Sequence, residues 1–136
     1  MTTPSSLSRP TGIPLRRRLG ARLAVTLATP LARLKPRTLR RVLTLLRRGA
    51  GPAGYDTAKA ARDAVLAVSL RCLGPQGCLP RSVAVALLCR MSGTWPTWCA
   101  GVRVMPPFGA HAWVEADGVP VDENLPAQYF RPLMTV

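Results

Sequence analysis

The sequence is poor in acidic and in aromatic residues. Asp and Glu number 6 against 19 Lys and Arg, and Phe, Trp and Tyr make up 5% of the 136 residues. Residues 1–50 contain twelve of the basic residues and no acid, whereas residues 64–136 are nearly neutral. A basic chain often binds nucleic acid or an anionic surface. Residues 1–54 have no aromatic side chain to stack on a base, so we expect no nucleic-acid partner.

Long apolar runs are also missing. No stretch approaches the roughly 18 to 20 apolar residues of a membrane-spanning helix. The segment RRRLGARLAVTLATPLA resembles a twin-arginine export signal, but Arg22 interrupts its apolar part, Pro30 breaks it, and a second basic segment follows directly. An export signal is therefore the weaker interpretation. We expect a cytoplasmic protein whose four cysteines are reduced thiols.

Closely spaced cysteine pairs are absent too. Structural zinc sites prefer pairs of ligands with two to four residues between them. The candidate ligands here are more widely spaced, at Cys72, Cys78, Cys89, Cys99 and the only histidine, His111. A zinc module is thus a poor alternative, and we expect neither a metal nor a cofactor.

The chain is long enough for one core and an accessory segment. Proline, serine and threonine predict a disordered tail over residues 1–14. Residues 15–54 are predicted to form basic amphipathic helices, which we expect to be packed by their leucines with arginines on solvated faces. The functional alternatives for them are a dock for an acidic partner or an interfacial membrane helix. Residues 55–136 are the predicted core. The leucines that define the first helix recur every four residues, at Leu15, Leu19, Leu23, Leu27 and Leu31.

A buried helix is predicted within GPQGCLPRSVAVALLCRMSG, residues 74–93. Its residues are apolar on every side, which indicates burial. Cys78 stands at its start, where unpaired amides and the helix dipole stabilise a thiolate, so we expect Cys78 to be a nucleophile. Cys89 lies about 16 Å further along the helix and is expected to be a small core residue, like Cys99. Cys72 is within reach of Cys78 for a regulatory disulfide, although packing is the simpler role.

Three strands are predicted after this helix, over residues 97–105, 109–116 and 119–124. The dipeptide Asp-Gly between the last two is a strong hairpin signal. A buried helix followed by an antiparallel sheet predicts an α+β fold.

His111 follows the cysteine in the chain, and acidic residues follow the histidine. A thiol nucleophile needs an imidazole to take its proton, and the imidazole needs an acceptor that fixes its tautomer. With a two-residue Asp-Gly turn, strand alternation places Asp122 and Asn124 on the face of His111 and turns Glu123 away. A shift by one residue would exchange the faces. We predict Asp122 as the acid, with Glu123 second and Asn124 third.

The same segment resembles a known family. The pattern CLxRS at the start of the buried helix, TWPTW before GVRV, and AHAWVE followed by a DG turn are similar to the transglutaminase-like core of lasso-peptide maturation peptidases. The resemblance is to the actinobacterial short form of the "B" protein, which removes the leader from a lasso precursor. It covers residues 71 to about 124, and the basic helical N-terminus is also typical of the family.

The resemblance implies a papain-like cysteine peptidase with Cys78 as nucleophile, His111 as base and an acid near Asp122 or Glu123. Gln76 would stand where it could help the Cys78 amide form an oxyanion hole, although a turn role suits it equally. The implied partners are a separate small leader-recognition protein, the precursor peptide and an ATP-dependent lasso cyclase. Two other classes stay open, an acyltransferase with the same triad and a basic nucleic-acid- or membrane-binding protein without catalysis.

Overall fold

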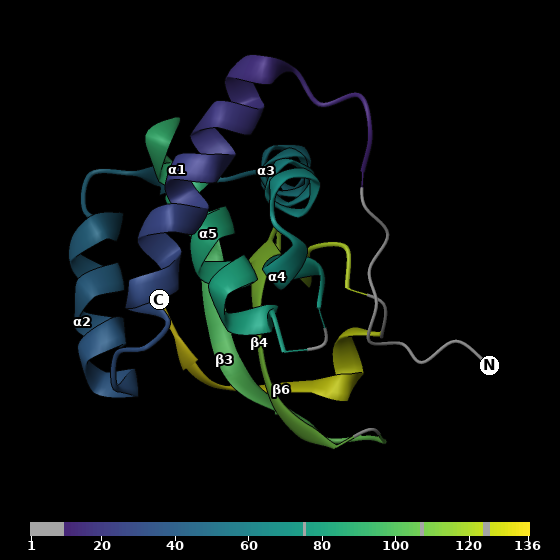
Figure 1. The fold of residues 1–136 in the computed structure, drawn as a ribbon. Coiled ribbons are helices and arrows are strands. Elements are labelled where there is room, and N and C mark those ends of the chain that lie inside the picture. Colours follow the sequence, from purple (N-terminus) through teal and green to yellow (C-terminus); the bar gives the residue numbers. More distant parts are fainter. Residues whose placement is uncertain (1–9, 75, 107, 124–125) are drawn as a thin grey trace.

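The computed structural model describes residues 10–74, 76–106, 108–123 and 126–136, and combines helices with a small sheet (Figure 1). This confirms the predicted α+β class. The helices are α1 (Leu15–Leu31), α2 (Pro36–Arg47), α3 (Tyr55–Val68), α4 (Leu70–Leu73), α5 (Cys78–Met91) and the short 3-10 helix η1 (Ala127–Tyr129). The strands are β1 (Gly51–Pro52), β2 (Thr94–Trp95), β3 (Thr97–Arg103), β4 (Gly109–Ala116), β5 (Val119–Pro120) and β6 (Phe130–Thr135).

The main sheet is antiparallel, with the strand order β5-β4-β3-β6. β3 and β4 pair along their length, from Thr97 opposite Glu115 to Arg103 opposite Gly109. β1 and β2 form a separate short parallel pair. Neither this pair nor β6 was predicted from the sequence. β6 carries Pro132 and lies at the edge of the sheet. An edge strand tolerates proline because one side of the strand has no partner that needs a backbone N–H.

The cysteine-bearing helix α5 lies between α1 on one side and β4 on the other (Figure 1). Its residues from Val83 to Leu87 are all buried, as the continuous apolar run predicts. The indole Nε1 of Trp98 in β3 donates to the hydroxyl of Ser82 at 3.0 Å, which ties α5 to the sheet. α5 also packs against β4, the strand that carries His111.

The packing of α1 differs from the expectation. Its buried residues are alanines, and four of its leucines face solvent. Small residues let α1 approach α5 closely: a Cβ added to Gly20 would lie 3.3 Å from Leu88 Cδ1. The expectation that leucines pack this helix is therefore wrong for α1, whereas α2 does bury Leu39 and Leu43. The three buried alanines are Ala21, Ala24 and Ala28.

The predicted tail falls largely on residues 1–9, outside the described residues, and residues 10–14 lead into α1 without helix or strand. Within the described part of the chain, every helix is too short or too polar to cross a bilayer.

Candidate active site

Cys78 is the first residue of α5 and is half-buried. Gly77 precedes it as the N-cap, and the Gly77 carbonyl accepts the Arg81 amide at 2.9 Å, which closes the first turn. Pro80 fits this turn because its missing N–H would have no partner in the helix there. The Cys78 sulfur thus lies at the positive end of a buried helix, as the sequence predicts.

His111 lies on β4 opposite Gly101 of β3. Its ring stacks against Trp113, with 5.8 Å between ring centroids, and against Phe130 of β6 at 5.2 Å. β5 pairs with β4 only at Glu115 and Ala116, which leaves the β4 edge near Ala112 accessible to the start of α5. The thiol of Cys78 interacts there with both the His111 ring and the Ala112 amide.

His111 Nε2 forms a short hydrogen bond with Glu123 Oε1. Both side chains are nearly buried, with 10% of the histidine and 7% of the glutamate side chain exposed. Because Nε2 is engaged by the carboxylate, Nδ1 is the ring nitrogen left for the thiol of Cys78. His111 therefore interacts with the thiol of Cys78 as well as with the carboxylate of Glu123.

The structure places Glu123, and not the predicted Asp122, against His111. The two-residue turn is as predicted, since Ala116 pairs with Val119. β5 ends at Pro120, however, and Asp122 adopts a left-handed conformation with φ 51°. This rotation breaks the strand alternation, so Glu123 reaches the His111 face without any change of register.

Asp122 instead points outward, with 45% of its side chain exposed. Its carboxylate lies 3.4 Å from Arg62 Nη1 and 3.8 Å from Lys59 Nζ. Its amide donates to the Tyr55 hydroxyl at 3.1 Å. The third candidate, Asn124, lies outside the described residues.

Arg62 of α3 is a site residue that the sequence reasoning missed. Its side chain is 6% exposed, and Nη2 lies 3.3 Å from Glu123 Oε2. Burial alone would raise the Glu123 pKa, but the hydrogen bond and charge of His111, together with the charges of Arg62 and Arg81, outweigh it and lower that pKa. One signal was available in the sequence: Arg62 falls within the apolar face that Ala58 and Val65 define, where a cation needs a buried acid.

The surroundings of Cys78 lower its pKa in spite of its burial. Burial alone would raise its pKa, but hydrogen bonds from His111 and the Ala112 amide, with the charges of His111 and Arg81, lower it. Burial would likewise lower the His111 pKa, and the bonds to Cys78 and Glu123 raise it instead. The two shifts bring the thiol and the imidazole toward a thiolate-imidazolium pair.

The other cysteines differ from Cys78 in burial and, for Cys89 and Cys99, in the direction of the pKa shift. Cys72, Cys89 and Cys99 are buried, whereas Cys78 is half-buried. Burial raises the pKa of Cys89 to about 12, and burial with the nearby Glu115 raises the pKa of Cys99 to about 12. Cys89 and Cys99 thus have the environment of core residues, and Cys78 that of a nucleophile.

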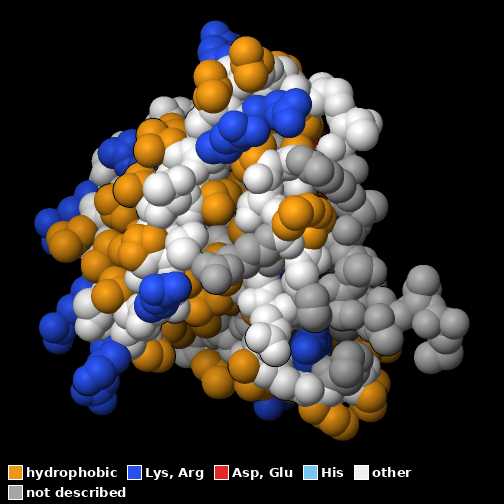
Figure 2. Space-filling model, viewed as in Figure 1, with side chains coloured by type: hydrophobic (Ala, Val, Ile, Leu, Met, Phe, Trp, Pro, Cys, Tyr) orange, Lys and Arg blue, Asp and Glu red, His pale blue; other side chains and the backbone are white. Residues whose placement is uncertain are grey.

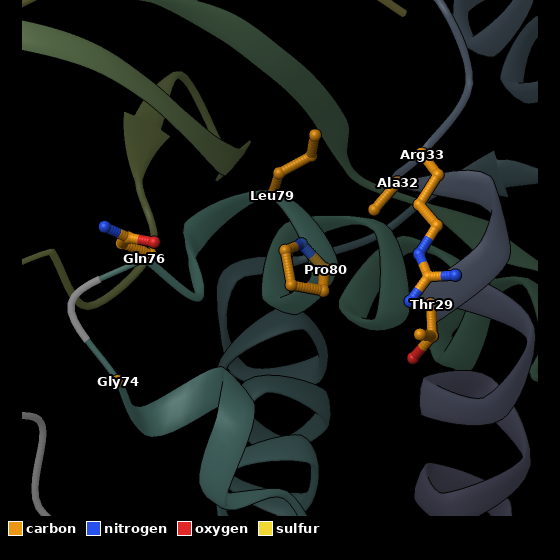
Figure 3. A pocket seen from close by; sticks show the side chains of 7 residues that line it. All are labelled: Thr29, Ala32, Arg33, Gly74, Gln76, Leu79 and Pro80. Carbon is orange, nitrogen blue, oxygen red and sulfur yellow. The ribbon is translucent and has the colours of Figure 1, made fainter.

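A cavity of about 540 Å³ opens beside the start of α5, and Figure 3 shows Gln76 and Arg33 at its two ends with Pro80 between them. The side chain of Gln76 is exposed. Its proposed oxyanion role stays a prediction. The complete lining is Thr29, Ala32, Arg33, Gly74, Gln76, Leu79 and Pro80. Across the described ranges, His, Cys, Asp and Glu residues form no group of three that could hold a metal ion.

Comparison with protein families gives a match to the transglutaminase-like superfamily over residues 21–135. The match begins inside α1 and runs through the site to the end of β6. Comparisons with curated proteins and with solved structures gave no significant match. Since the family match covers most of the chain and includes Cys78, His111 and Glu123, the protein belongs to the transglutaminase-like superfamily.

Proposed function

We propose that the protein is a cysteine peptidase that removes the leader from a lasso-peptide precursor. The observation that carries the catalytic part is the hydrogen bond of His111 with Glu123, beside the Cys78 thiol at the start of a buried helix. The substrate class rests on the resemblance of the CLxRS, TWPTW and AHAWVE motifs to those of the maturation peptidases.

The geometry suits acyl transfer through a thioester. The Cys78 thiolate attacks the carbonyl carbon of the scissile peptide bond, and the unpaired amides at the start of α5 stabilise the resulting oxyanion. The His111 imidazolium then protonates the leaving amine, which departs as the new N-terminus of the core peptide. His111 next takes a proton from water, which attacks the thioester and releases the leader as a carboxylic acid. Glu123 stabilises the imidazolium in both steps.

Substrate delivery belongs to the same proposal. The leader would be held by a separate recognition protein, and the freed amine would pass to an ATP-dependent cyclase. The cavity between Gln76 and Arg33 is lined by Leu79 and Pro80, the two residues that follow Cys78 in the chain, and we propose it as a place for a residue of the bound peptide.

An acyltransferase would form the same thioester and resolve it with an amine in place of water. Superfamily membership is compatible with either outcome. In hydrolysis the acyl carbon gains an oxygen atom from water, and in acyl transfer it gains the nitrogen atom of the amine. Isotope labelling of the water distinguishes the two reactions.

The test is incubation of purified protein with precursor peptide and recognition protein in water enriched in ¹⁸O, followed by mass spectrometry. We expect a leader whose new carboxylate carries one ¹⁸O atom, and an unmodified core peptide with a free amine. Cys78→Ala should abolish both products, whereas the matched control Cys89→Ala should retain turnover at some cost in stability. A leader joined to an amine would contradict hydrolysis, and equal loss in both folded variants would contradict the assignment of Cys78.

A further inference from the structure

A row of four leucines lies along α1 on the side away from the core. Their exposed fractions are 71%, 56%, 53% and 46%. At about 100° per residue, a spacing of four turns the row by only about 40° at each step, so the leucines form one continuous stripe about 18 Å long. The buried alanines occupy the other side of the helix. In order along α1, the leucines are Leu15, Leu19, Leu23 and Leu27.

A second helix also exposes leucines. In α2, Leu45 and Leu46 are 58% and 36% exposed, although Leu39 and Leu43 are buried. Figure 2 shows hydrophobic side chains over α1 and α2 with Lys and Arg side chains interspersed and around their edge. We call the exposed leucines of α1 and α2 with their neighbouring arginines the leucine-arginine face. Its exposed arginines are Arg16, Arg17, Arg22, Arg40, Arg41, Arg47 and Arg48.

The arginines of this face have no carboxylate partner within the described residues. The ion pairs found there all involve Lys59, Arg62 or His111, in the other part of the fold. The sequence contains no acid before Asp56. A partner of this face must therefore supply negative charge and also accept apolar side chains.

Several kinds of partner fit poorly. A second copy of the chain would bring two surfaces of equal positive charge together. Nucleic acid offers phosphates but no apolar surface for leucines, and the face has no aromatic residue for base stacking. Protein interfaces are enriched in tyrosine and tryptophan, and leucine is under-represented among their dominant contacts. Large exposed apolar patches nevertheless mark binding surfaces on soluble proteins.

We propose that the leucine-arginine face docks the protein on an anionic membrane surface. An amphipathic helix of this kind lies in the plane of the interface, with its leucines at the boundary of the acyl chains and its arginines among lipid phosphates. The broad, unpaired positive charge matches a diffuse anionic surface. This inference does not depend on the proposed peptidase activity.

The first test is co-sedimentation of the full-length protein with vesicles of phosphatidylcholine alone or mixed with phosphatidylglycerol. We expect binding to the anionic vesicles only. The double variant Leu19→Ser and Leu23→Ser should bind at least about tenfold more weakly, because it removes two apolar groups from the interface. Arg16→Gln and Arg22→Gln should each weaken binding about fivefold.

The matched control places the same substitutions elsewhere on the surface. Leu70 and Leu133 are 74% and 73% exposed and lie on α4 and β6. The double variant Leu70→Ser and Leu133→Ser should bind like the unmodified protein. All these side chains are exposed, and circular dichroism checks that each variant folds. Equal binding by the two double variants would overturn the proposal, since general positive charge alone would then explain the attraction.

The second test measures how deeply the leucine row of α1 enters the lipid bilayer. The three native tryptophans are buried, so a new tryptophan in the exposed row reports on the lipid. We expect brominated phosphatidylglycerol to quench the fluorescence of Leu23→Trp and to leave Leu133→Trp unchanged. An absence of quenching at position 23 with vesicles bound would overturn insertion. Binding to an acidic protein but to no anionic vesicle would likewise overturn the choice of a lipid partner.

Discussion

Replacing Glu123 with glutamine should shift Cys78 from thiolate toward neutral thiol. The carboxylate accepts the hydrogen bond of His111 Nε2, and its charge helps to raise the His111 pKa. Glutamine keeps the size of the side chain and an oxygen acceptor, but it removes the negative charge. The imidazolium form therefore loses the stabilisation that Glu123 adds to that of Cys78, and the thiolate that depends on this cation becomes less populated.

The magnitude follows from the kind of contact that is lost. A hydrogen bond to a charged group contributes about 1.5–3 kcal/mol, and 1.36 kcal/mol corresponds to a factor of ten. The fraction of protein with the thiolate-imidazolium pair should thus fall about 10- to 100-fold in Glu123→Gln. The contact is almost fully buried, so little of this effect is screened by solvent.

The assay is alkylation by iodoacetamide across pH, with each cysteine resolved by peptide mass mapping. At pH 6, Cys78 in the unmodified protein should react about 10- to 100-fold faster than in Glu123→Gln, and the difference should shrink above pH 9. The control Asp122→Asn should retain the profile of the unmodified protein. A shift in Asp122→Asn as large as in Glu123→Gln would refute the reasoning, as would identical profiles in all three proteins.

Cys89 provides a reference inside the same molecule. At pH 7, a thiol with a pKa of about 12 is ionised about a thousandfold less than one at the ordinary value of 9.0, and the Cys78 pKa lies below 9.0. The greater nucleophilicity of the more basic thiolate recovers about 30-fold of this difference. Cys78 should still react at least about 30-fold faster, and the burial of Cys89 widens the gap.

Three further outcomes are expected. Arg62→Met should lower the free energy of unfolding in urea by about 3 kcal/mol, because it removes the buried cation that pairs with Glu123 Oε2. Gly101→Ala should cost at least about 2 kcal/mol in the same assay, since an added Cβ would overlap the Arg131 carbonyl oxygen. The stability difference between the unmodified protein and Glu123→Gln should be largest between about pH 4.5 and 6.5. Because the folded-state pKa of Glu123 is lowered, its contribution to stability is fully present above pH 4.5 and is lost as pH falls through that folded-state pKa. Because the folded-state pKa of His111 is raised, its contribution is fully present below pH 6.5 and is lost as pH rises through the folded-state pKa of His111.

The sequence predicts those parts of the fold that depend on local pattern. The apolar run after Cys78 specifies a buried helix because no side of it is polar. The Asp-Gly dipeptide specifies the turn after β4, and the first pair beyond it, Ala116 with Val119, has the predicted register. The proximity of Cys78 and His111 depends in addition on the packing of α5 against β4.

The parts that depend on tertiary packing were not predicted. Periodicity shows that α1 has a leucine face and an alanine face, but the choice between them depends on how closely α5 approaches Gly20. Hydrophobicity favours burying the leucines, and close helix packing buries the alanines instead. Arg62 was missed for a similar reason, since its partner Glu123 is about sixty residues distant in sequence and lies beyond the reach of helix-level rules.

The position of Glu123 depends on the backbone of Asp122, and this leads to a last prediction. A left-handed conformation is unfavourable for most residues, tolerated by Asp and Asn, and freely adopted by glycine. Asp122→Gly should therefore keep Glu123 on the face of His111 and retain the Cys78 alkylation profile, despite losing the contact with Arg62. Asp122→Val resists φ near 51° and should lower the free energy of unfolding by about 1–2 kcal/mol more than Asp122→Gly. It should also slow alkylation at pH 6, because the relaxed chain returns to strand alternation and turns Glu123 away. Equal stability and equal alkylation in the two variants would show that side-chain contacts, and not this backbone rotation, place the acid.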